Sequence, residues 1–231
     1  MKIKIPLTLI TLSVISLSSI HAQQNSGSIW LRTNYNFSTQ LQRNPSKPED
    51  GQTQMPFNQG IGIGISHIYP IANRWSLESN LSYQKKGFRT KLQVGVAFGP
   101  PEINGYSELT LSDNYHYLDL NETIWFKIAK TRKFGLSIGA GIGIGNLISY
   151  KKGSDFWLMK LTSAEHTEYI NAKPNPFSVF RYAGIEAAIG NRFMIGFDNK
   201  NDIGRFIKTD HFETKNWVWS INISYSLQKQ S

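Results

Sequence analysis

The chain has 231 residues, a formal net charge of +9 and no cysteine. The absence of cysteine argues against disulfide bonds and against a lipid anchor on an N-terminal cysteine. Beyond the N-terminal segment, no run approaches the roughly 20 apolar residues that a transmembrane helix needs. If this chain crosses a membrane, it must therefore cross as β-strands.

The start of the chain has the features of a secretory signal peptide. Two lysines precede an apolar run over residues 5–20, and cleavage is expected after Ala22. We therefore expect residues 1–22 to be removed and residues 23–231 to form one exported domain. The basic charge favours contact with anionic surfaces such as lipopolysaccharide phosphates. Nucleic acid is not an expected partner, because the exported chain has no basic helix or stacking motif.

Eight segments alternate apolar and polar residues with a period of two, which is typical of β-strands with one apolar face. The expected strands cover residues 28–38, 60–68, 75–88, 115–129, 134–145, 177–189, 193–199 and 216–227. The last strand places Trp217, Trp219, Ile221, Ile223, Tyr225 and Leu227 on one face. So regular a strand near the end of an exported chain suits the closing strand of a transmembrane barrel.

The connections between these segments alternate between long and short. Long polar segments cover residues 39–57, 89–114, 151–176 and 200–214, and the second of them has the pattern of a projecting hairpin with arms at 91–98 and 106–111. The three short turns place an aromatic residue after a basic one, at Trp75, Phe134 and Phe193, which are spaced 59 residues apart. An aromatic ring beside a cation suits a membrane interface.

These patterns predict an all-β fold, an eight-stranded antiparallel up-and-down transmembrane β-barrel with short periplasmic turns and long extracellular loops. We expect a monomer in the outer membrane of a Gram-negative bacterium, with both chain ends in the periplasm. A soluble secreted barrel of lipocalin kind, with its apolar face turned inward around a ligand, fits the same alternation. The repeated turns and the glycine-rich opposite face favour the membrane orientation.

The strand over residues 134–145 alternates glycine and apolar residues and so contains G-x-G-x-G. A phosphate-binding loop is not expected there, because the glycines keep a strict period of two and no helix follows. Glycine on the inner face instead lets a narrow barrel bend and leaves room for larger side chains from neighbouring strands.

The polar faces carry charges of both signs on different strands. An eight-stranded barrel is just wide enough to be filled by side chains, so we expect a plugged, salt-bridged lumen. A narrow gated ion path is the alternative. The expected lumen network comprises Arg32, Glu78, Asp119, Lys127, Glu186 and Asp198. Glu122 falls on the apolar face of its strand, which a β-bulge would explain. The expected interfacial aromatic residues are Trp75, Phe134, Phe193, Trp217, Trp219 and Tyr225.

No catalytic, cofactor or metal site is expected. A barrel enzyme needs a histidine beside a carboxylate or serine near the outer rim. His67, His116, His166 and His211 form no such dyad in the sequence pattern, and no His-x-His or carboxylate cluster indicates a metal. An outer-membrane lipid-modifying enzyme is the alternative functional class.

Three segments resemble the outer-membrane β-barrel domains of Bacteroidota, including the PorT-like proteins. They are GIGIGISHIYPIANRWSLESNLSYQKKG at residues 60–87, YLDLN at 117–121, and the glycine-alternating strand. The family usually has YLEIP at the second segment and an aromatic residue where this chain has Leu227. The resemblance covers nearly all of the mature chain and implies an eight-stranded barrel of OmpA/OmpX type without catalytic residues.

For PorT-like proteins the resemblance also implies a role in type IX protein secretion. The expected function is therefore non-enzymatic: envelope structure, binding through external loops, or service as a PorT-like accessory of secretion. The expected partners are outer-membrane lipid, lipopolysaccharide, and secretion-system or envelope proteins.

Overall fold

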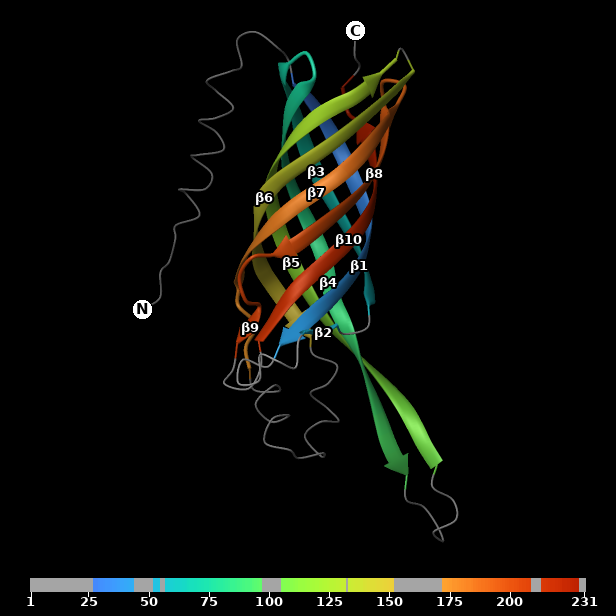
Figure 1. Cartoon of the computed structure of the whole chain (residues 1–231), viewed down its shortest axis with the longest axis vertical. Helices are drawn as coiled ribbons and strands as arrows, with labels where there is room; N and C mark the ends of the chain where they lie inside the picture. Colours follow the sequence, from blue (N-terminus) through green and yellow to red (C-terminus); the bar gives the residue numbers. More distant parts are fainter. Residues whose placement is uncertain are drawn as a thin grey trace, which may run out of the picture.

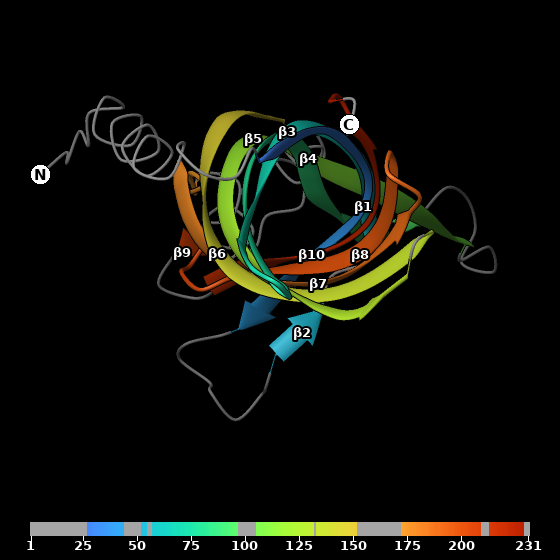
Figure 2. The ribbon, with the colours of Figure 1, turned by 90° about the horizontal axis from the view of Figure 1, so that it is seen from above.

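The computed structural model describes residues 27–43, 52–54, 57–96, 105–131, 133–151, 172–208 and 213–228. Its eight long strands are β1 (Ser28–Arg43), β3 (Asn58–Ala72), β4 (Trp75–Val96), β5 (Gly105–Lys130), β6 (Phe134–Lys151), β7 (Phe177–Ile189), β8 (Phe193–Asp202) and β10 (Glu213–Ser226). Neighbouring strands pair antiparallel, and the pairing of β1 with β10 closes the sheet into a barrel (Figure 1, Figure 2). The predicted eight-stranded antiparallel barrel is thus confirmed. The expected signal peptide, residues 1–22, lies outside the described residues.

The short connections lie together at one end of the barrel, which we call the short-turn end. They join β3 to β4, β5 to β6 and β7 to β8. Gly190, in the last of them, has a φ of 61°, a left-handed conformation that glycine adopts readily. The described chain also begins and ends there, because Leu227 donates its backbone N–H to the carbonyl of Ile29 over 2.9 Å.

The opposite end, which we call the loop end, carries the longer connections and two short strands (Figure 1). Strand β2 (Gln52–Gln54) pairs with β1, and β9 (Ile207–Lys208) pairs with β10. The predicted alternation of long and short connections is confirmed. The predicted loops were nevertheless too long, because β1, β6 and β8 continue beyond their predicted ends to Arg43, Lys151 and Asp202.

The β4–β5 hairpin differs most from its prediction. Separate hairpin arms within a loop over residues 89–114 were expected, but β4 and β5 are continuous strands of 22 and 26 residues. Strand β3 pairs with β4 only as far as Gln84, whereas β4 and β5 stay paired to Val96 and Gly105. The hairpin therefore projects well beyond the barrel wall at the loop end (Figure 1).

The outer surface of the barrel is apolar and its interior is polar. On β3, Ile61, Ile63 and Ile65 are all more than half exposed, whereas Glu78 and Asp119 of the neighbouring strands are fully buried inside. A soluble barrel around an apolar ligand has the opposite arrangement, so the lipocalin-like alternative is wrong. An apolar belt this extensive is stable against lipid and not against water. The described residues contain no helix that is both long and apolar enough to cross a bilayer.

The glycines of β6 make room for aromatic side chains from the adjacent strands, as the sequence predicted. A Cβ on Gly139 would lie 2.5 Å from the indole of Trp125, and one on Gly143 would overlap the ring of Phe180. Both aromatic side chains are buried inside the barrel. Because glycine has no side chain, these positions on β6 leave room for two large rings inside an eight-stranded barrel.

Gly143→Val is expected to destabilise the folded barrel by about 1–3 kcal/mol, because an overpacked core must shift side chains or backbone. The measurement is a urea titration of the purified protein in lipid vesicles, followed by tryptophan fluorescence. Gly135→Ala is the matched control, since its Cβ would meet Ala188 at an ordinary 3.5 Å. Equal stability of the Gly143→Val and Gly135→Ala variants would contradict the close packing of Phe180.

Candidate functional site

An arginine between two glutamates occupies the lumen near the short-turn end. The guanidinium Nη2 of Arg32 lies 2.8 Å from Glu78 Oε1 and 2.5 Å from Glu186 Oε1. Trp125 donates its indole N–H to the second oxygen of Glu78 over 2.6 Å. The three charged residues come from β1, β4 and β7 and are almost fully buried, so this cluster ties three separate strands together across the lumen.

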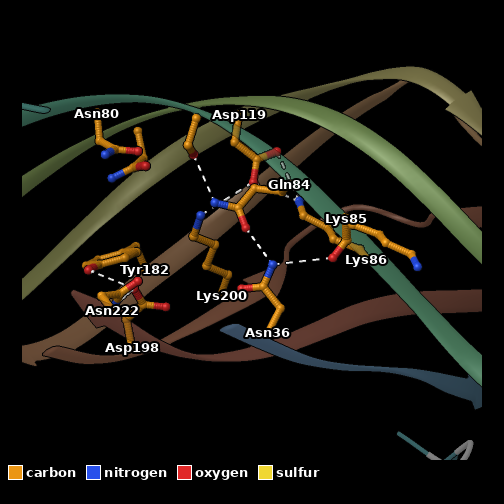
Figure 3. Close-up of polar contacts among 12 residues, drawn as sticks. Asn36, Asn80, Gln84, Lys85, Lys86, Asp119, Tyr182, Asp198, Lys200 and Asn222 are labelled. Carbon is orange, nitrogen blue, oxygen red and sulfur yellow. Dashed lines mark hydrogen bonds and ion pairs between the residues drawn. The ribbon is translucent and has the colours of Figure 1, made fainter. Parts of the chain in front are cut away.

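Asp198 on β8 lies beside this cluster and is held by uncharged donors. Tyr182 donates its hydroxyl to Asp198 Oδ2 over 3.2 Å, and Asn222 donates its amide to the same oxygen over 2.6 Å (Figure 3). All three side chains are buried inside the barrel. Asp198 thus joins β8 to β7 and β10 through hydrogen bonds, and it has no ion pair with any described residue.

A second charge cluster lies further toward the loop end. The ammonium group of Lys86 is 2.9 Å from Asp119 Oδ2, and that of Lys200 is 3.5 Å from the same oxygen (Figure 3). Lys86 also lies 4.4 Å from the ring centroid of Tyr117, and both lysines lie over the ring of Phe180. Each cation therefore has both a carboxylate and aromatic faces as partners in the lumen.

An aromatic cluster closes the lumen at the loop end. Its members are Phe88, Tyr115, Tyr117, Phe206 and Ile207, each at most 2% exposed. Phe206 packs edge-on against Tyr115 with centroids 4.7 Å apart, and Phe88 stacks on Tyr115 at 6.3 Å. Phe206 and Ile207 come from the segment between β8 and β10, where the backbone of Phe206 is hydrogen-bonded to Asn175 on one side and to Thr214 on the other. We call these five residues the aromatic lid.

The short-turn end of the barrel has a hollow among its described residues. A hollow of about 420 Å³ enters the lumen there, and its lining includes Trp30, Trp125, Lys127, Met194 and Glu186. The Arg32 cluster lies at its base, since Glu186 belongs to both. We call this hollow at the short-turn end the vestibule. Beyond it, toward the loop end, the lumen is filled by the side chains of the charge clusters and the aromatic lid.

Five of the six residues predicted for the lumen network lie in these clusters. Arg32, Glu78 and Glu186 form one cluster, and Asp119 and Asp198 belong to others. Lys127 is apart from them: it is half-buried at the vestibule, and no ion pair among the described residues joins it to the other five. A register shift between Lys127 and Ala129 ends the regular alternation of β5 at this point.

Sequence reasoning missed Lys86, Lys200 and Tyr182. Lys86 continues the polar alternation of Glu78, Asn80, Ser82 and Gln84 along β4, and Lys200 continues that of Asp198 along β8. Lys86 lies inside the predicted strand 75–88 and was overlooked on its polar face, whereas Lys200 lies one residue beyond the predicted end of its strand at residue 199. Tyr182 had no comparable signal, because aromatic residues occur on both faces of this barrel.

The predicted interfacial aromatic residues lie on the outer surface near the two ends of the barrel. Trp75, Phe134 and Phe193 are exposed at the start of their strands at the short-turn end, where Tyr225 packs 5.2 Å from Phe193. Arg192 donates to the Tyr225 hydroxyl over 3.3 Å, so a cation does accompany this aromatic pair. Trp217 and Trp219 lie toward the loop end of β10, 5.8 Å apart.

Glu122 lies on the outer face, as its place in the sequence indicates, but no bulge explains it. The register of β4 and β5 is continuous where Ser79 faces Glu122, and the register shifts of β5 with β6 lie elsewhere. The hydroxyl of Ser79 donates to Glu122 Oε2 over 2.7 Å. This hydrogen bond reduces the cost of placing the carboxyl among apolar neighbours.

The described histidines make contacts with aromatic side chains. His116 Nδ1 lies 2.5 Å from the hydroxyl of Tyr83 on the outer face, and His67 packs against Tyr69 at 5.9 Å. His166 and His211 lie outside the described residues. Within the described residues, no group of three or more His, Cys, Asp or Glu side chains is arranged to hold a metal ion.

No family model matches the chain, and no curated protein matches it. Solved structures do resemble it. The outer membrane protein OprG from Pseudomonas aeruginosa is 10% identical, with 89% of this chain and 98% of that chain covered and a TM-score of 0.46. Neisserial surface protein A is 7% identical (88% and 100% covered, TM-score 0.45), and Ail of Yersinia pestis is 11% identical (85% and 99% covered, TM-score 0.39). At these identities the likeness concerns the fold alone.

Proposed function

We propose that this chain is an integral outer-membrane protein whose barrel is a sealed, non-enzymatic anchor and whose function is carried by the loop end. That function is binding at the cell surface, in envelope structure or as a PorT-like accessory of protein secretion. The observation that carries the proposal is the filled lumen, in which two charge clusters and the aromatic lid lie in succession.

The charges inside the lumen favour a structural role over conduction. Arg32 is held by two carboxylates from different strands, and Lys86 and Lys200 share one. A conducting path needs ions to enter and leave, which requires weak and exchangeable contacts. Buried pairs that are also hydrogen-bonded resist such exchange, because separating them leaves uncompensated charges buried inside the protein.

The proposed orientation places the short-turn end in the periplasm. Short periplasmic turns and longer external loops are general among outer-membrane barrels. The exposed rings of Trp75, Phe134 and Phe193 form an aromatic belt at the short-turn end, and Trp217 and Trp219 belong to a second belt toward the loop end. The β4–β5 hairpin and the long loops then face outward.

Planar-bilayer recordings of the purified protein are expected to show no steady conductance. The reason is that side chains fill the lumen between the vestibule and the loop end. Insertion is verified in the same sample by the heat-dependent gel migration that folded barrels show. A steady conductance that Arg32→Ala abolishes would contradict the sealed barrel and support the ion path.

Affinity purification in mild detergent tests the proposed binding role. A matched variant has residues 92–109 replaced by Asn-Gly, which joins the paired positions Lys91 and Thr110 through a two-residue turn and leaves the closed ring intact. We expect the full chain to recover secretion-system or envelope proteins that the shortened chain does not. Identical recovery by both would contradict a role for the hairpin.

The enzyme alternative is tested separately by incubating the protein with lipid A. A change in the mass of lipid A would favour a lipid-modifying enzyme.

A further inference from the structure

We propose that a basic hollow on the outer surface at the loop end binds the phosphate groups of a glycolipid in the outer leaflet of the membrane. The inference rests on the outer-membrane placement proposed above and adds a site, with its ligand class, to that placement. We call this site the cationic hollow. Its functional side chains are Lys173, Asn175, Arg205, Lys208, Glu213 and Lys215.

The cationic hollow has a volume of about 780 Å³ and is open to one side. Three segments line it: residues 173–175 before β7, residues 203–208 between β8 and β10, and residues 213–215 at the start of β10. A volume of this size accepts a phosphorylated sugar and not only a single ion.

The backbone holds these three segments together. Asn175 donates its N–H to the carbonyl of Phe206 over 2.7 Å, and Phe206 donates to the carbonyl of Thr214 over 2.7 Å. Thr214 also accepts from the N–H of Ile207 through its hydroxyl, over 3.3 Å. Because Phe206 and Ile207 belong to the aromatic lid, the outward Arg205 and Lys208 are attached to a buried, packed segment. The frame of the site is therefore preorganised.

The charges of the cationic hollow are unbalanced. It contains four cationic side chains and one carboxylate, Glu213, which lies 2.5 Å from Arg205 Nε. In the described part of the chain, Lys173, Lys208 and Lys215 have no ion pair. On β1, the residue that faces Lys215 is the apolar Leu41. Three lysines that repel one another around one hollow are stabilised by an anion, and a phosphate monoester carries about −1.5 to −2 charges at neutral pH.

The outer face of β10 shows the depth of this site in the membrane. From the middle of the strand toward the loop end it presents Ile223, Ile221, Trp219, Trp217 and Lys215 in succession. Apolar side chains suit the hydrocarbon region, tryptophan suits the boundary, and lysine suits the headgroup phosphates. Lys215 lies two residues beyond Trp217, about 7 Å further along the strand. This sequence of side chains favours a phosphate attached to a lipid over one free in solution.

Gly204 offers a way to test the site without disturbing the fold. It lines the cationic hollow, and a Cβ at this position would meet nothing within 4 Å. Gly204→Glu therefore adds a negative charge to the hollow, and Gly204→Gln adds a side chain of the same shape without the charge. Lys208→Gln with Lys215→Gln removes two cations that form no ion pair among the described residues, although Lys208 faces Glu213 across β9 and β10.

The experiment measures binding of the purified, folded full chain in nonionic detergent to diphosphoryl lipid A, and to the same lipid A after removal of its phosphates. We expect the phosphorylated form to bind more tightly. The double lysine variant should lose about 25-fold in affinity, at roughly fivefold for each cation at a membrane surface. Gly204→Glu should weaken binding several-fold and Gly204→Gln should leave it unchanged.

Three results would overturn the proposal. Equal affinity for both forms of lipid A would exclude phosphate recognition, and equal effects of Gly204→Glu and Gly204→Gln would exclude a charge effect at this hollow. Binding of inorganic phosphate or a soluble sulfated saccharide as tight as that of lipid A would assign the site to soluble anions. Membrane fractionation of cells separately tests the outer-membrane placement, since lipid A binding in detergent does not depend on it.

Discussion

Arg32→Ala is expected to lower the free energy of unfolding by about 3–5 kcal/mol, because it leaves two buried carboxylates without a counter-charge. Glu78 and Glu186 both contact the same guanidinium, at 2.8 and 2.5 Å. The measurement is a urea titration in lipid vesicles, followed by tryptophan fluorescence. Arg181→Ala is the matched control, since Arg181 is exposed on the outer face and belongs to no ion pair among the described residues.

A rescue variant separates the charge effect from lost packing. Arg32→Met combined with Glu78→Gln and Glu186→Gln removes the cation and both anions while it keeps their approximate volumes. We expect this triple variant to regain most of the lost stability, because replacing a complete buried ion cluster is often close to neutral. A triple variant as unstable as Arg32→Ala would show that the guanidinium contributes through its shape and not through its charge.

Phe206→Ala is expected to open the loop end of the lumen and to destabilise the barrel by about 3–5 kcal/mol. Because the native chain has no cysteine, a single thiol can report the opening. Ser178 suits this purpose, since it is 8% exposed and lies at the level of Asp119 beneath the aromatic lid. In Ser178→Cys alone, the thiol should react slowly with a maleimide added from the loop side.

Adding Phe206→Ala should raise that labelling rate by at least about tenfold, because the local opening then costs less free energy. Phe177→Ala is the control for loss of a phenyl ring, since Phe177 lies on the outer face and is 37% exposed. It should leave the labelling rate unchanged. Fast labelling of the Ser178→Cys variant with the lid intact would mean that the loop end is open in the native protein.

The alternation of side chains was sufficient to predict the barrel. Ile61, Ile63 and Ile65 against Gly60, Gly62 and Gly64 define two faces, and the register places them outside and inside as expected. Which face would point outward was harder, since inside and outside can exchange without changing the pattern. The aromatic residues Trp75, Phe134 and Phe193 at the three short turns indicated that the apolar face points outward, because repeated aromatic residues at one end of a barrel are typical of a membrane interface.

The interior was predicted less completely for a physical reason. Alternation states which residues point inward, but contacts across the lumen depend on the stagger between strands that are distant in the sequence. Arg32 and Glu186 are 154 residues apart and meet only because the sheet closes. The burial of Phe206 and Ile207 was also not predicted, because residues 200–214 were interpreted as a polar loop. Lys127 was predicted to join the network, but it forms no ion pair among the described residues, and the register of β5 with β6 shifts just after it.

The length of the β4–β5 hairpin gives this protein a reach that its barrel alone does not have. Beyond Phe88, which forms an isolated bridge with Phe57, β4 continues from Arg89 to Val96 in pairing with β5. At roughly 3.3 Å per residue, that extension spans about 26 Å. In the proposed orientation, this extension would place a binding partner well above the lipid surface. The same two strands continue without a break into the barrel wall, where β4 carries Lys86 and β5 carries Asp119 of the buried ion pair.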